Sequence, residues 1–410
     1  MPSRTLFYHI TWLKRLHFKR LRGLWGIYLH SMFRTMGMSL VGIFIPIYIY
    51  QLTGEFIPIF IFYLFYHLTV VFTSSLVGMS MKHFGVDKIA ILGAVLRAVF
   101  LFLLILSKSQ LGLLWPSAII WGLAVSSTWL PYHYTVVVED DGDGKFGHEV
   151  SALRVVDKLA AGAAPFIGGV VIYFFGFSVL YLVGIILVAI SAIPLLIDSF
   201  DKRQMRYQIG RVWQELFDKR LRPVAIGLSG SVLEGQIFAI FRPLFIFLAL
   251  ANVTKLGAIE SIALLCGIAI TWWAGNWVDK KGFGLMKIGI AANFFAFLLL
   301  PFLSLSWEFF LFTTIYVLIA ALIWTPFDAA MYQFASQRRK LEFFVQREII
   351  IHGASAVFFS LVWIVFGNNL NWLVIFGLGS FSLLLSLAIL KGVKSAPLDK
   401  RLEIHPTIAR

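Results

Sequence analysis

The segment 256–306 reads LGAIESIALLCGIAITWWAGNWVDKKGFGLMKIGIAANFFAFLLLPFLSLS. Two apolar runs, 256–278 and 284–306, flank a short basic turn. Each run exceeds the roughly 20 residues that a helix needs to cross a hydrocarbon core about 30 Å thick. Inside lipid the backbone must satisfy its own polar groups, which a helix does without a partner strand. The segment therefore predicts two membrane-spanning helices joined by a tight turn.

Runs of this kind recur along the whole chain. Hydrophobic residues make up 59% of the 410 residues and charged residues 14%, with a mean hydropathy of +0.85. A soluble protein carries roughly a quarter charged residues, so this composition excludes an ordinary soluble domain. The predicted spans are 25–51, 56–80, 88–107, 112–138, 151–176, 178–198, 223–250, 256–278, 284–306, 308–335, 345–367 and 371–391. The predicted fold class is an all-α integral membrane protein with twelve transmembrane helices.

The net charge is +14, and the basic residues lie at the ends of the apolar runs instead of forming one patch. This distribution favours contact with membrane lipids over a nucleic-acid partner. With an even number of spans, most basic connections fall on one side, as Lys82, Lys280 and Lys281 do. The connections on the other side hold only Lys108 and Lys255. The positive-inside rule then predicts a multi-pass protein of the cell (cytoplasmic) membrane with both termini cytoplasmic.

A basic stretch near the middle of the chain separates two sets of six spans. The predicted organisation is a basic cytoplasmic or interfacial N-terminus at 1–23, a six-helix bundle at 24–198, a basic cytoplasmic linker at 199–222, a second six-helix bundle at 223–392 and a cytoplasmic tail at 393–410. The two bundles carry matching residues at offsets of 197, 197, 195 and 193, namely Pro46 and Pro243, Gly78 and Gly275, Trp129 and Trp324, and Arg154 and Arg347. Four matches in the same order predict two pseudo-symmetric halves related by an axis along the membrane normal.

The loop Gly275-Asn-Trp-Val-Asp279-Lys280-Lys281-Gly282 has a glycine, an aspartate four residues on, a basic residue and a second glycine. With this signature the chain resembles the major facilitator superfamily (MFS) of transporters over nearly its whole length. The resemblance implies the MFS fold. It also implies that the loop latches the cytoplasmic side while a central cavity faces outward. In that state Asp279 would bond near the start of the fifth span, beside Arg154.

The first half carries a divergent copy of this loop, Gly78-Met-Ser-Met-Lys82-His83-Phe-Gly85, with lysine where the family has aspartate. We predict that the first-half latch is lost or has reversed its charge, with Glu348 as the partner of Lys82. The predicted gating-loop residues are Gly78, Lys82, Gly85, Gly275, Asp279, Lys280 and Gly282. In the fifth span, Pro165, Gly168 and Gly169 resemble part of the family's antiporter motif. A plain packing face of small residues is the alternative.

Polar side chains within the spans are functional candidates, because a charge near a helix centre costs about 2.5–3.5 kcal/mol on insertion scales. The resemblance implies that the first and fourth helices of each half line the cavity. The candidates for substrate binding or coupling on these helices are Arg34, His133, Glu234, Gln236, Arg242, Asp328 and Tyr332. Arg34 and Arg242 are candidate cationic anchors. Glu234, Asp328 and His133 are candidate proton carriers, because burial disfavours the charged form of a carboxyl group. Interhelical pairs or snorkelled side chains are the alternative for each residue. The residues assigned to gating or structural roles are Arg154, Asp157, Arg347 and Glu348.

These patterns predict a secondary active transporter that moves a small solute by alternating access, with protons as a candidate coupling ion. The alternatives are an efflux antiporter for lipophilic, drug-like compounds, an uncoupled facilitator and a non-transporting receptor. An integral-membrane lipid enzyme would need a nucleophile, an acid–base pair or a metal near one interface, and the sequence offers none of these. We predict no catalytic residue, cofactor or metal site, and we expect a monomer.

Overall fold

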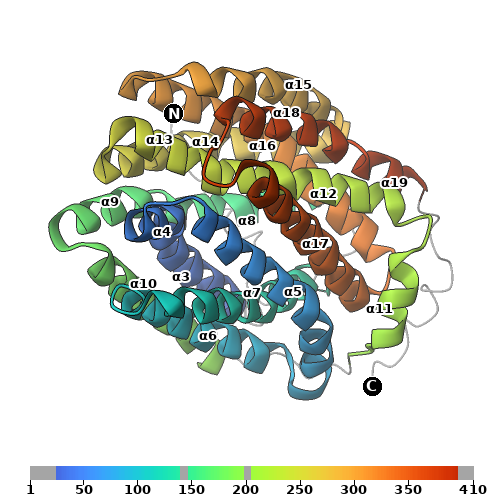
Figure 1. Cartoon of the computed structure of the whole chain (residues 1–410). Coiled ribbons are helices and arrows are strands. Elements are labelled where there is room, and N and C mark those ends of the chain that lie inside the picture. The colour runs from blue at the N-terminus through green and yellow to red at the C-terminus, as the bar shows by residue number, and fades with distance from the viewer. Residues whose placement is uncertain (1–24, 139–145, 198–204, 396–410) are drawn as a thin grey trace, which may run out of the picture.

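The computed structural model describes residues 25–138, 146–197 and 205–395, and every regular element within these ranges is helical (Figure 1). Twelve helices there are long and apolar enough to cross a membrane. The predicted all-α fold with twelve transmembrane helices is thereby confirmed. The predicted N-terminal segment 1–23 lies outside the described residues, as do most of the tail and the beginning of the linker.

Each half holds six spans. The first half contains α3 (Trp25–Val41), η1 (Gly42–Phe44), α4 (Ile45–Thr53), α5 (Ile57–Phe84), α6 (Val86–Leu106), η2 (Leu111–Leu113), α7 (Leu114–Val138), α8 (Phe146–Ala161), α9 (Ala164–Phe175) and α10 (Phe177–Ile197). After the linker helix α11 (Ile209–Leu216), the second half contains α12 (Arg222–Gln236), the π-helical turn η3 (Ile237–Phe241), α13 (Arg242–Leu250), α14 (Val253–Lys281), α15 (Gly284–Leu299), η4 (Leu300–Phe302), α16 (Ser306–Ser336), α17 (Lys340–Phe366), α18 (Trp372–Ser386) and α19 (Ile389–Ser395). In Figure 1 the blue-to-green first half lies mostly below the yellow-to-red second half.

The internal repeat predicted from the prolines is visible in the bounds of the elements. α4 and α13 are displaced by 197 residues at both ends, and each has a proline, Pro46 or Pro243, in its first turn. Proline fits there because the first N–H groups of a helix have no intrahelical partner. Each helix is followed by a residue in the left-handed region, Gly54 with φ 74° and Ala251 with φ 50°. The two halves are therefore built to one plan.

Several helices extend beyond the apolar runs that predicted them. α5 continues to Phe84, α8 begins at Phe146 and α17 begins at Lys340. Polar residues outside the apolar layer can continue the hydrogen bonding of a helix, so hydropathy underestimates its length. The fifth span is also broken between α8 and α9, where Pro165 lies in the first turn of α9. This break was not predicted.

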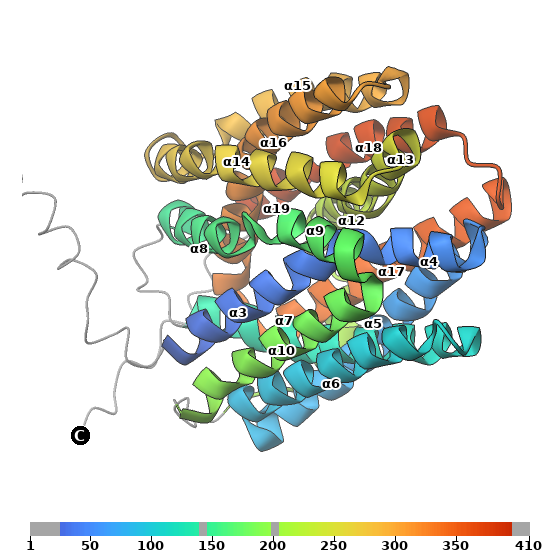
Figure 2. The same ribbon diagram turned by 90° about the vertical axis from the view of Figure 1, so that its left-hand side faces the viewer.

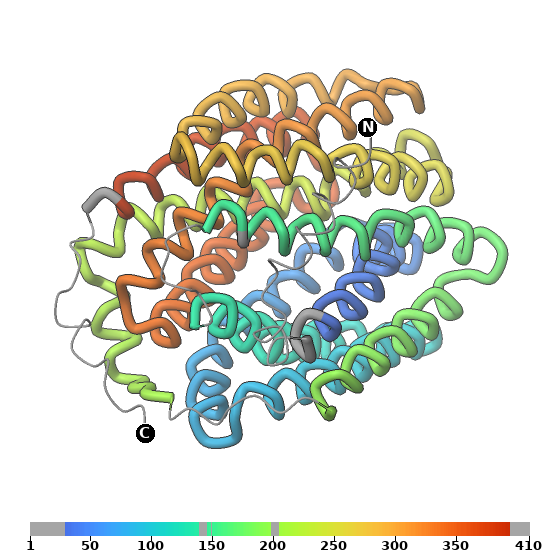
Figure 3. Tube along the Cα trace, turned by 180° about the vertical axis from the view of Figure 1, so that it is seen from behind, coloured from blue at the N-terminus to red at the C-terminus, as the bar shows by residue number. Residues whose placement is uncertain are grey.

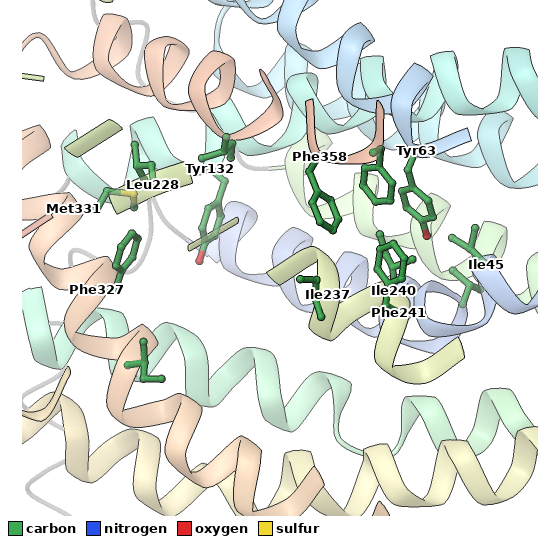
Figure 4. Packing of buried hydrophobic residues seen from close by; sticks show 14 of the residues in the cluster. Ile45, Tyr63, Tyr132, Leu228, Ile237, Ile240, Phe241, Phe327, Met331 and Phe358 are labelled. Atoms are coloured by element: carbon green, nitrogen blue, oxygen red, sulfur yellow. The ribbon is translucent and has the colours of Figure 1, made fainter. Parts of the chain in front are cut away.

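The most extensive contacts between the two halves are made by three helix pairs. α5 packs against α17, and α8 and α9 pack against α14 (Figures 2 and 3). Aromatic rings fill the α5–α17 region, where Tyr63 stacks on Phe359 with ring centroids 5.3 Å apart, and Phe60 stacks on Phe241 at 6.0 Å. Figure 4 shows Tyr63, Phe241 and Phe358 gathered at this contact. Such packing excludes water from this part of the interface between the halves.

The described part of the linker packs against both halves. The Tyr207 hydroxyl donates to the carbonyl of Ser75 on α5 at 3.0 Å. Val212 of α11 is fully buried, and its carbonyl accepts a hydrogen bond from Nε2 of Gln346 on α17 at 3.2 Å. The sequence predicted only a basic segment beside the headgroups, because these contacts depend on where α5 and α17 lie in space.

Candidate functional site

A cavity of about 390 Å³ lies between the halves, near the middle of the spans that surround it. α8 is the first half's contribution to this central cavity, and α12, η3, α14, α16 and α17 supply the remainder. The charged side chains that line it are Arg154, Lys158, Glu234, Asp328 and Arg347. Apolar side chains, among them Phe238 and Trp324, complete the wall. The volume and the mixed lining are those of a small-molecule site.

An ion pair joins the two halves at the central cavity. The Arg154 guanidinium donates from Nε at 3.1 Å and from Nη2 at 2.6 Å to Oδ2 of Asp328. The arginine belongs to α8 and the aspartate to α16. Sequence reasoning placed Arg154 among the gating residues and Asp328 among the substrate or coupling residues, and the structure brings them together. A relative movement of the halves would have to lengthen or break this pair.

Lys158 contributes a cation that has no carboxylate partner within the described part of the chain. Its Nζ donates to the carbonyl of Gly267 at 3.2 Å and to the hydroxyl of Thr271 at 2.7 Å, both on α14. These two bonds leave the third N–H of the ammonium group for another acceptor. Lys158 was not among the predicted substrate or coupling residues, although its spacing of four from Arg154 indicates a shared helix face.

Arg347 reaches the central cavity from the second half, as its repeat counterpart Arg154 does from the first. Its Nη1 donates to Oε1 of the adjacent Glu348. The predicted pairing of Glu348 with Lys82 is therefore wrong. Lys82 lies in the last turn of α5 and donates to the carbonyl of Tyr207 at 3.5 Å, whereas Glu348 lies inside α17 beside its own arginine.

A column of side chains in the second half links Glu234 to Arg242. Oε1 of Glu234 accepts a hydrogen bond from the Tyr316 hydroxyl, and the Tyr316 ring stacks on Phe238 with centroids 4.0 Å apart. The Arg242 guanidinium lies over the Phe238 ring, 3.9 Å from its centroid. Nη1 and Nη2 of Arg242 donate to the two carboxylate oxygens of Glu260 on α14, at 2.6 and 2.8 Å.

The structure corrects the prediction that Arg242 is a substrate anchor in the cavity. Arg242 is 1% exposed, is absent from the cavity lining, and has Glu260 and Thr313 as partners. Sequence reasoning missed Glu260 because a lone glutamate near the start of an apolar span gives no sign of its partner. Glu234 does line the cavity, and its role in substrate binding or coupling stays a prediction.

Arg34 and His133 lie outside the central cavity, on the first-half helices that the resemblance expected to line it. Arg34 donates to the Ser31 hydroxyl at 2.9 Å, and its guanidinium lies 4.4 Å from the Trp129 ring. Nδ1 of His133 shares a hydrogen bond of 2.7 Å with the hydroxyl of Tyr332 on α16. The first half instead presents α8 to the cavity, because α8 packs closely against α14 and α16.

The remaining predicted polar residues also take part in interhelical contacts. Oδ1 of Asp157 accepts a hydrogen bond of 3.2 Å from the Thr35 hydroxyl, which joins α8 to α3. Gln236 lies beside His67 of α5. Neither Asp157 nor Gln236 lines the central cavity.

Asp279 connects the halves at the end of the bundle where α14 finishes, which we term the Asp279 end. Its two carboxylate oxygens accept hydrogen bonds from the backbone N–H groups of Gly147 at 2.9 Å and His148 at 2.8 Å. These N–H groups belong to the first turn of α8, where a carboxylate also interacts favourably with the helix dipole. This is the position that the family resemblance implied for Asp279.

The glycines of the two loops serve close packing and tight turns. Gly275 faces Ser151 and the Gly147 carbonyl so closely that a Cβ would lie 2.5 Å from that oxygen. A Cβ on Gly78 would lie 2.9 Å from the Tyr207 ring. Gly85 and Gly282 end α5 and α14 with φ of 94° and 73°, a region that favours glycine. Lys280, the other predicted residue of this loop, is exposed.

A second set of contacts joins the halves at the opposite end, which we term the Asn368 end. Oδ1 of Asn368 accepts hydrogen bonds from the backbone N–H groups of Phe56 at 3.0 Å and Ile57 at 3.1 Å. At the same end, a Cβ on Gly169 would lie 2.6 Å from the Val253 carbonyl at the start of α14. The halves are thus held together on both sides of the central cavity.

The fifth-span motif lies in helix contacts. Gly168 faces the Leu40 carbonyl of α3, and the Pro165 carbonyl faces Gly257 of α14. Small residues at these positions let the backbones approach closely. This placement agrees with the packing alternative and leaves the antiport role a prediction.

A transmembrane bundle of two like halves that encloses a polar cavity is the architecture of a membrane transporter. The sequence model of the Major Facilitator Superfamily matches residues 27–342. The chain therefore belongs to this family, and it is a multi-pass membrane transporter rather than an enzyme. No curated protein sequence matches the chain significantly.

Similar solved structures are transporters of the same fold. The human organic anion transporter MFSD10 has a TM-score of 0.66 at 12% identity, over 90% of this chain and 99% of that one. The nucleoside transporter NupG has a TM-score of 0.65 at 14% identity, over 90% and 99%. A bacterial homologue of the iron transporter ferroportin in an outward-facing state has a TM-score of 0.64 at 12% identity, over 90% and 98%. At these identities the likeness shows the fold alone.

Proposed function

We propose that the chain is a secondary transporter that works by alternating access, with the central cavity as its substrate site. Three features support the proposal: the cavity lies near the middle of the spans, both halves line it, and polar contacts join the halves at each end. Opening one end while the other stays joined would expose the cavity to one side at a time. Rocking of repeat-related halves about a fixed site is the general mechanism of such transporters.

The observation that carries the proposal is the pair of hydrogen bonds from α8 to Asp279. Hydrogen bonds to a charged group contribute about 1.5–3 kcal/mol each when protected from water, and less at an exposed site such as this one. Bonds of that strength hold one state and still allow exchange with another. The Asp279 end is therefore built as a reversible closure between the halves.

We further propose that the Asp279 end faces the cytoplasm of a cell whose cytoplasmic membrane holds the protein. Support comes from the basic side chains Lys82, Lys280, Lys281 and Lys287 near this end, as the positive-inside rule requires. We also propose that the two bundles comprise residues 24–198 and 223–392 and that residues 199–222 form the linker between them. The transporter acts as a monomer in this proposal.

Three cations against two carboxylates in the cavity lining favour a small substrate with an acidic group. Lys158 offers an N–H donor and an ion-pair site that no described carboxylate occupies. Arg154 and Arg347 add two further cations, each held by a neighbouring carboxylate. The apolar wall with Phe238 and Trp324 adds affinity for an organic portion. Together they fit an amphipathic organic anion better than an inorganic one.

Alternating access can be measured without knowing the substrate. Cys266 is exposed and is the only cysteine of the chain, so Cys266→Ser gives a background for spin labelling. Cysteines at the exposed Lys88 and Lys287 report the distance between the halves at the Asp279 end. A second pair, at the exposed Glu55 and Asn369, reports it at the Asn368 end.

Asp279→Ala is expected to lengthen the Lys88–Lys287 distance and to shorten or preserve the Glu55–Asn369 distance. Loss of the two bonds at an exposed site corresponds to about 1.5 kcal/mol. That energy shifts the ratio of closed to open molecules roughly tenfold. Electron–electron double resonance on the labelled pairs in lipid nanodiscs measures both populations. Lys280→Ala, in the same loop, is the matched control and should leave them unchanged. Identical distance distributions for the Asp279 and Lys280 variants would contradict the closure.

Lys158→Gln is expected to abolish the stabilisation of the purified protein by acidic ligands. In a thermal-shift panel of small organic acids and their methyl esters, binding acids should raise the denaturation temperature more than their esters do. Loss of a charge-assisted contact of about 1.5–3 kcal/mol should weaken binding at least roughly tenfold. Lys255→Gln, an exposed lysine of α14 remote from the cavity lining, is the control. A ligand that binds equally well to the Lys158 variant and to the wild type would refute the substrate class.

A further inference from the structure

Two histidines meet in the membrane interior at the contact between the halves. Nδ1 of His67 on α5 lies 2.7 Å from Nδ1 of His352 on α17. His67 is 0% exposed and His352 5%. Two ring nitrogens at this distance share a hydrogen bond, so one Nδ1 carries the hydrogen and the other presents a lone pair.

Glu348 fixes the direction of this hydrogen bond. Its Oε2 lies 3.4 Å from Nε2 of His352, one helical turn away, and this buried oxygen makes no hydrogen bond to any other described group. A carboxylate only accepts, so the nitrogen that faces it carries the hydrogen. A neutral His352 then has a lone pair at Nδ1, and His67 must be the donor between the rings.

This assignment leaves a lone pair at Nε2 of His67. That nitrogen is buried and makes no hydrogen bond within the described residues. The Gln236 side chain of α12 lies beside the ring, and its amide oxygen can accept from Nε2–H once the nitrogen is protonated. His67 therefore has a vacant proton-accepting atom next to a group able to bind the added hydrogen.

The polar surroundings of the pair come from four helices. Tyr66 of α5 packs on both rings, with centroids 4.5 Å from His67 and 5.5 Å from His352. The charged and titratable groups that face the pair or its Tyr66 neighbour are Arg97 from α6, and Glu348 and Arg347 from α17. Gln236 from α12 is neutral. Glu348 is thus the negative charge that would balance a proton on the rings.

We propose that the His67–His352 pair is the proton-binding site of the transporter, and that it passes the proton to Glu348. A proton first bonds to Nε2 of His67. The Nδ1 hydrogen of His67 then moves to Nδ1 of His352, and the Nε2 hydrogen of His352 moves to Oε2 of Glu348. The net result is one proton moved from the first half of the protein to the second, with His67 and His352 both neutral and each in its other tautomer. The site is reset when His67 gives up its Nε2 hydrogen and regains one at Nδ1, while His352 gives up its Nδ1 hydrogen and regains one at Nε2.

Proton arrival at Glu348 couples this pair to the central cavity. Arg347 lines the cavity and donates to Oε1 of the same carboxylate. A neutral Glu348 no longer balances the Arg347 charge, which then becomes a site for an acidic substrate. This coupling rests on the proposed transport function. It predicts that proton and anion enter the cavity region together.

Nitrogen-15 spectroscopy of histidine-labelled protein in lipid bilayers tests the pair directly. At pH 8 we expect one ring protonated at Nδ1 and one at Nε2, with a coupling between the two Nδ1 nuclei through their hydrogen bond. On stepwise acidification the signals of both rings should change together. His67→Gln and His352→Gln assign the signals, and each should alter the titration of the remaining ring. His83→Gln, an exposed histidine of α5, should alter neither. Absence of the coupling in the wild type, or rings that titrate independently, would overturn the proposal without relying on any variant.

The spin-label distances separate this proposal from the transport function beneath it. In the wild-type background the Lys88–Lys287 or Glu55–Asn369 populations should shift between pH 8 and pH 5, and the shift should be lost in His67→Gln. If Asp279→Ala moves the populations but pH does not, alternating access stands and the proton site is wrong. If neither Asp279→Ala nor pH moves them, the proposed transport mechanism itself fails.

Discussion

Glu260→Gln is expected to destabilise the protein by about 3–5 kcal/mol, the range found when one partner of a buried ion pair is removed. Glu260 and Arg242 are both buried, and the carboxylate accepts two hydrogen bonds from the guanidinium. Glutamine keeps the size of the side chain but removes the charge that compensates the arginine. The expected result is a large fall in the denaturation temperature in detergent or nanodiscs, measured by tryptophan fluorescence.

Two further variants show whether the uncompensated charge is the cause. Glu55→Gln changes an exposed glutamate and should cost less than about 0.5 kcal/mol. The double variant Arg242→Met/Glu260→Gln removes both charges and should recover most of the loss, because it leaves no uncompensated charge in the interior. Equal denaturation temperatures for the Glu260 and Glu55 variants would show that the pair contributes no stability.

The features predicted correctly from sequence are those that local signals determine. Apolar runs longer than the bilayer core specify the spans one by one. The repeat was readable because proline at the start of α4 and α13 has the same backbone requirement in each half. Gly282 is constrained in the same way, because the turn after α14 needs a positive φ. These requirements act over a few residues, so a single sequence reveals them.

The site was predicted only in part, because its pairs join residues far apart in the chain. Asp328 was recognised as a polar residue in a span, but its partner Arg154 lies in the other half of the protein, far away in the sequence. Arg242 was predicted to face the cavity because nothing near it in sequence indicated Glu260 as its partner. The choice of α8 as the first half's lining helix depends on its packing against α14, which hydropathy does not encode.

One missed feature had a usable signal. Lys158 follows Arg154 by one helical turn, so both cations belong to the same face of α8. Two cations on one face of a transmembrane helix are costly unless that face is turned away from lipid. α8 also carries Asp157 on a neighbouring face. The sequence alone therefore does not decide whether the face with Arg154 and Lys158 or the face with Asp157 is turned toward the cavity. The structure turns Arg154 and Lys158 to the cavity and Asp157 toward α3.

Gly275→Val is expected to prevent closure of the Asp279 end and to hold the transporter open there. α8 and α14 approach so closely that any Cβ at this position would overlap the Ser151 side chain and lie 2.5 Å from the Gly147 carbonyl. The overlap is with backbone as well as with a side chain, so a change of rotamer cannot relieve it. Overpacking should destabilise the closed state by about 1–3 kcal/mol and leave the open state unaffected. It should raise the ratio of open to closed molecules roughly 5- to 150-fold.

Because the open state separates α8 from α14, the valine meets no overlap there, and the protein should remain folded with the open state predominant. The Lys88–Lys287 distance should be long under all conditions, and transport of any identified substrate should be lost. Gly377→Val places the same side chain on α18, where a Cβ meets no atom within 4 Å, and should leave the distances unchanged. Ser151→Gly in the Gly275→Val background removes part of the overlap and should restore some closed molecules. A Gly275 variant that closes as the wild type does would mean that the halves do not separate along the α8–α14 contact, and the movement would then have to occur between α5 and α17.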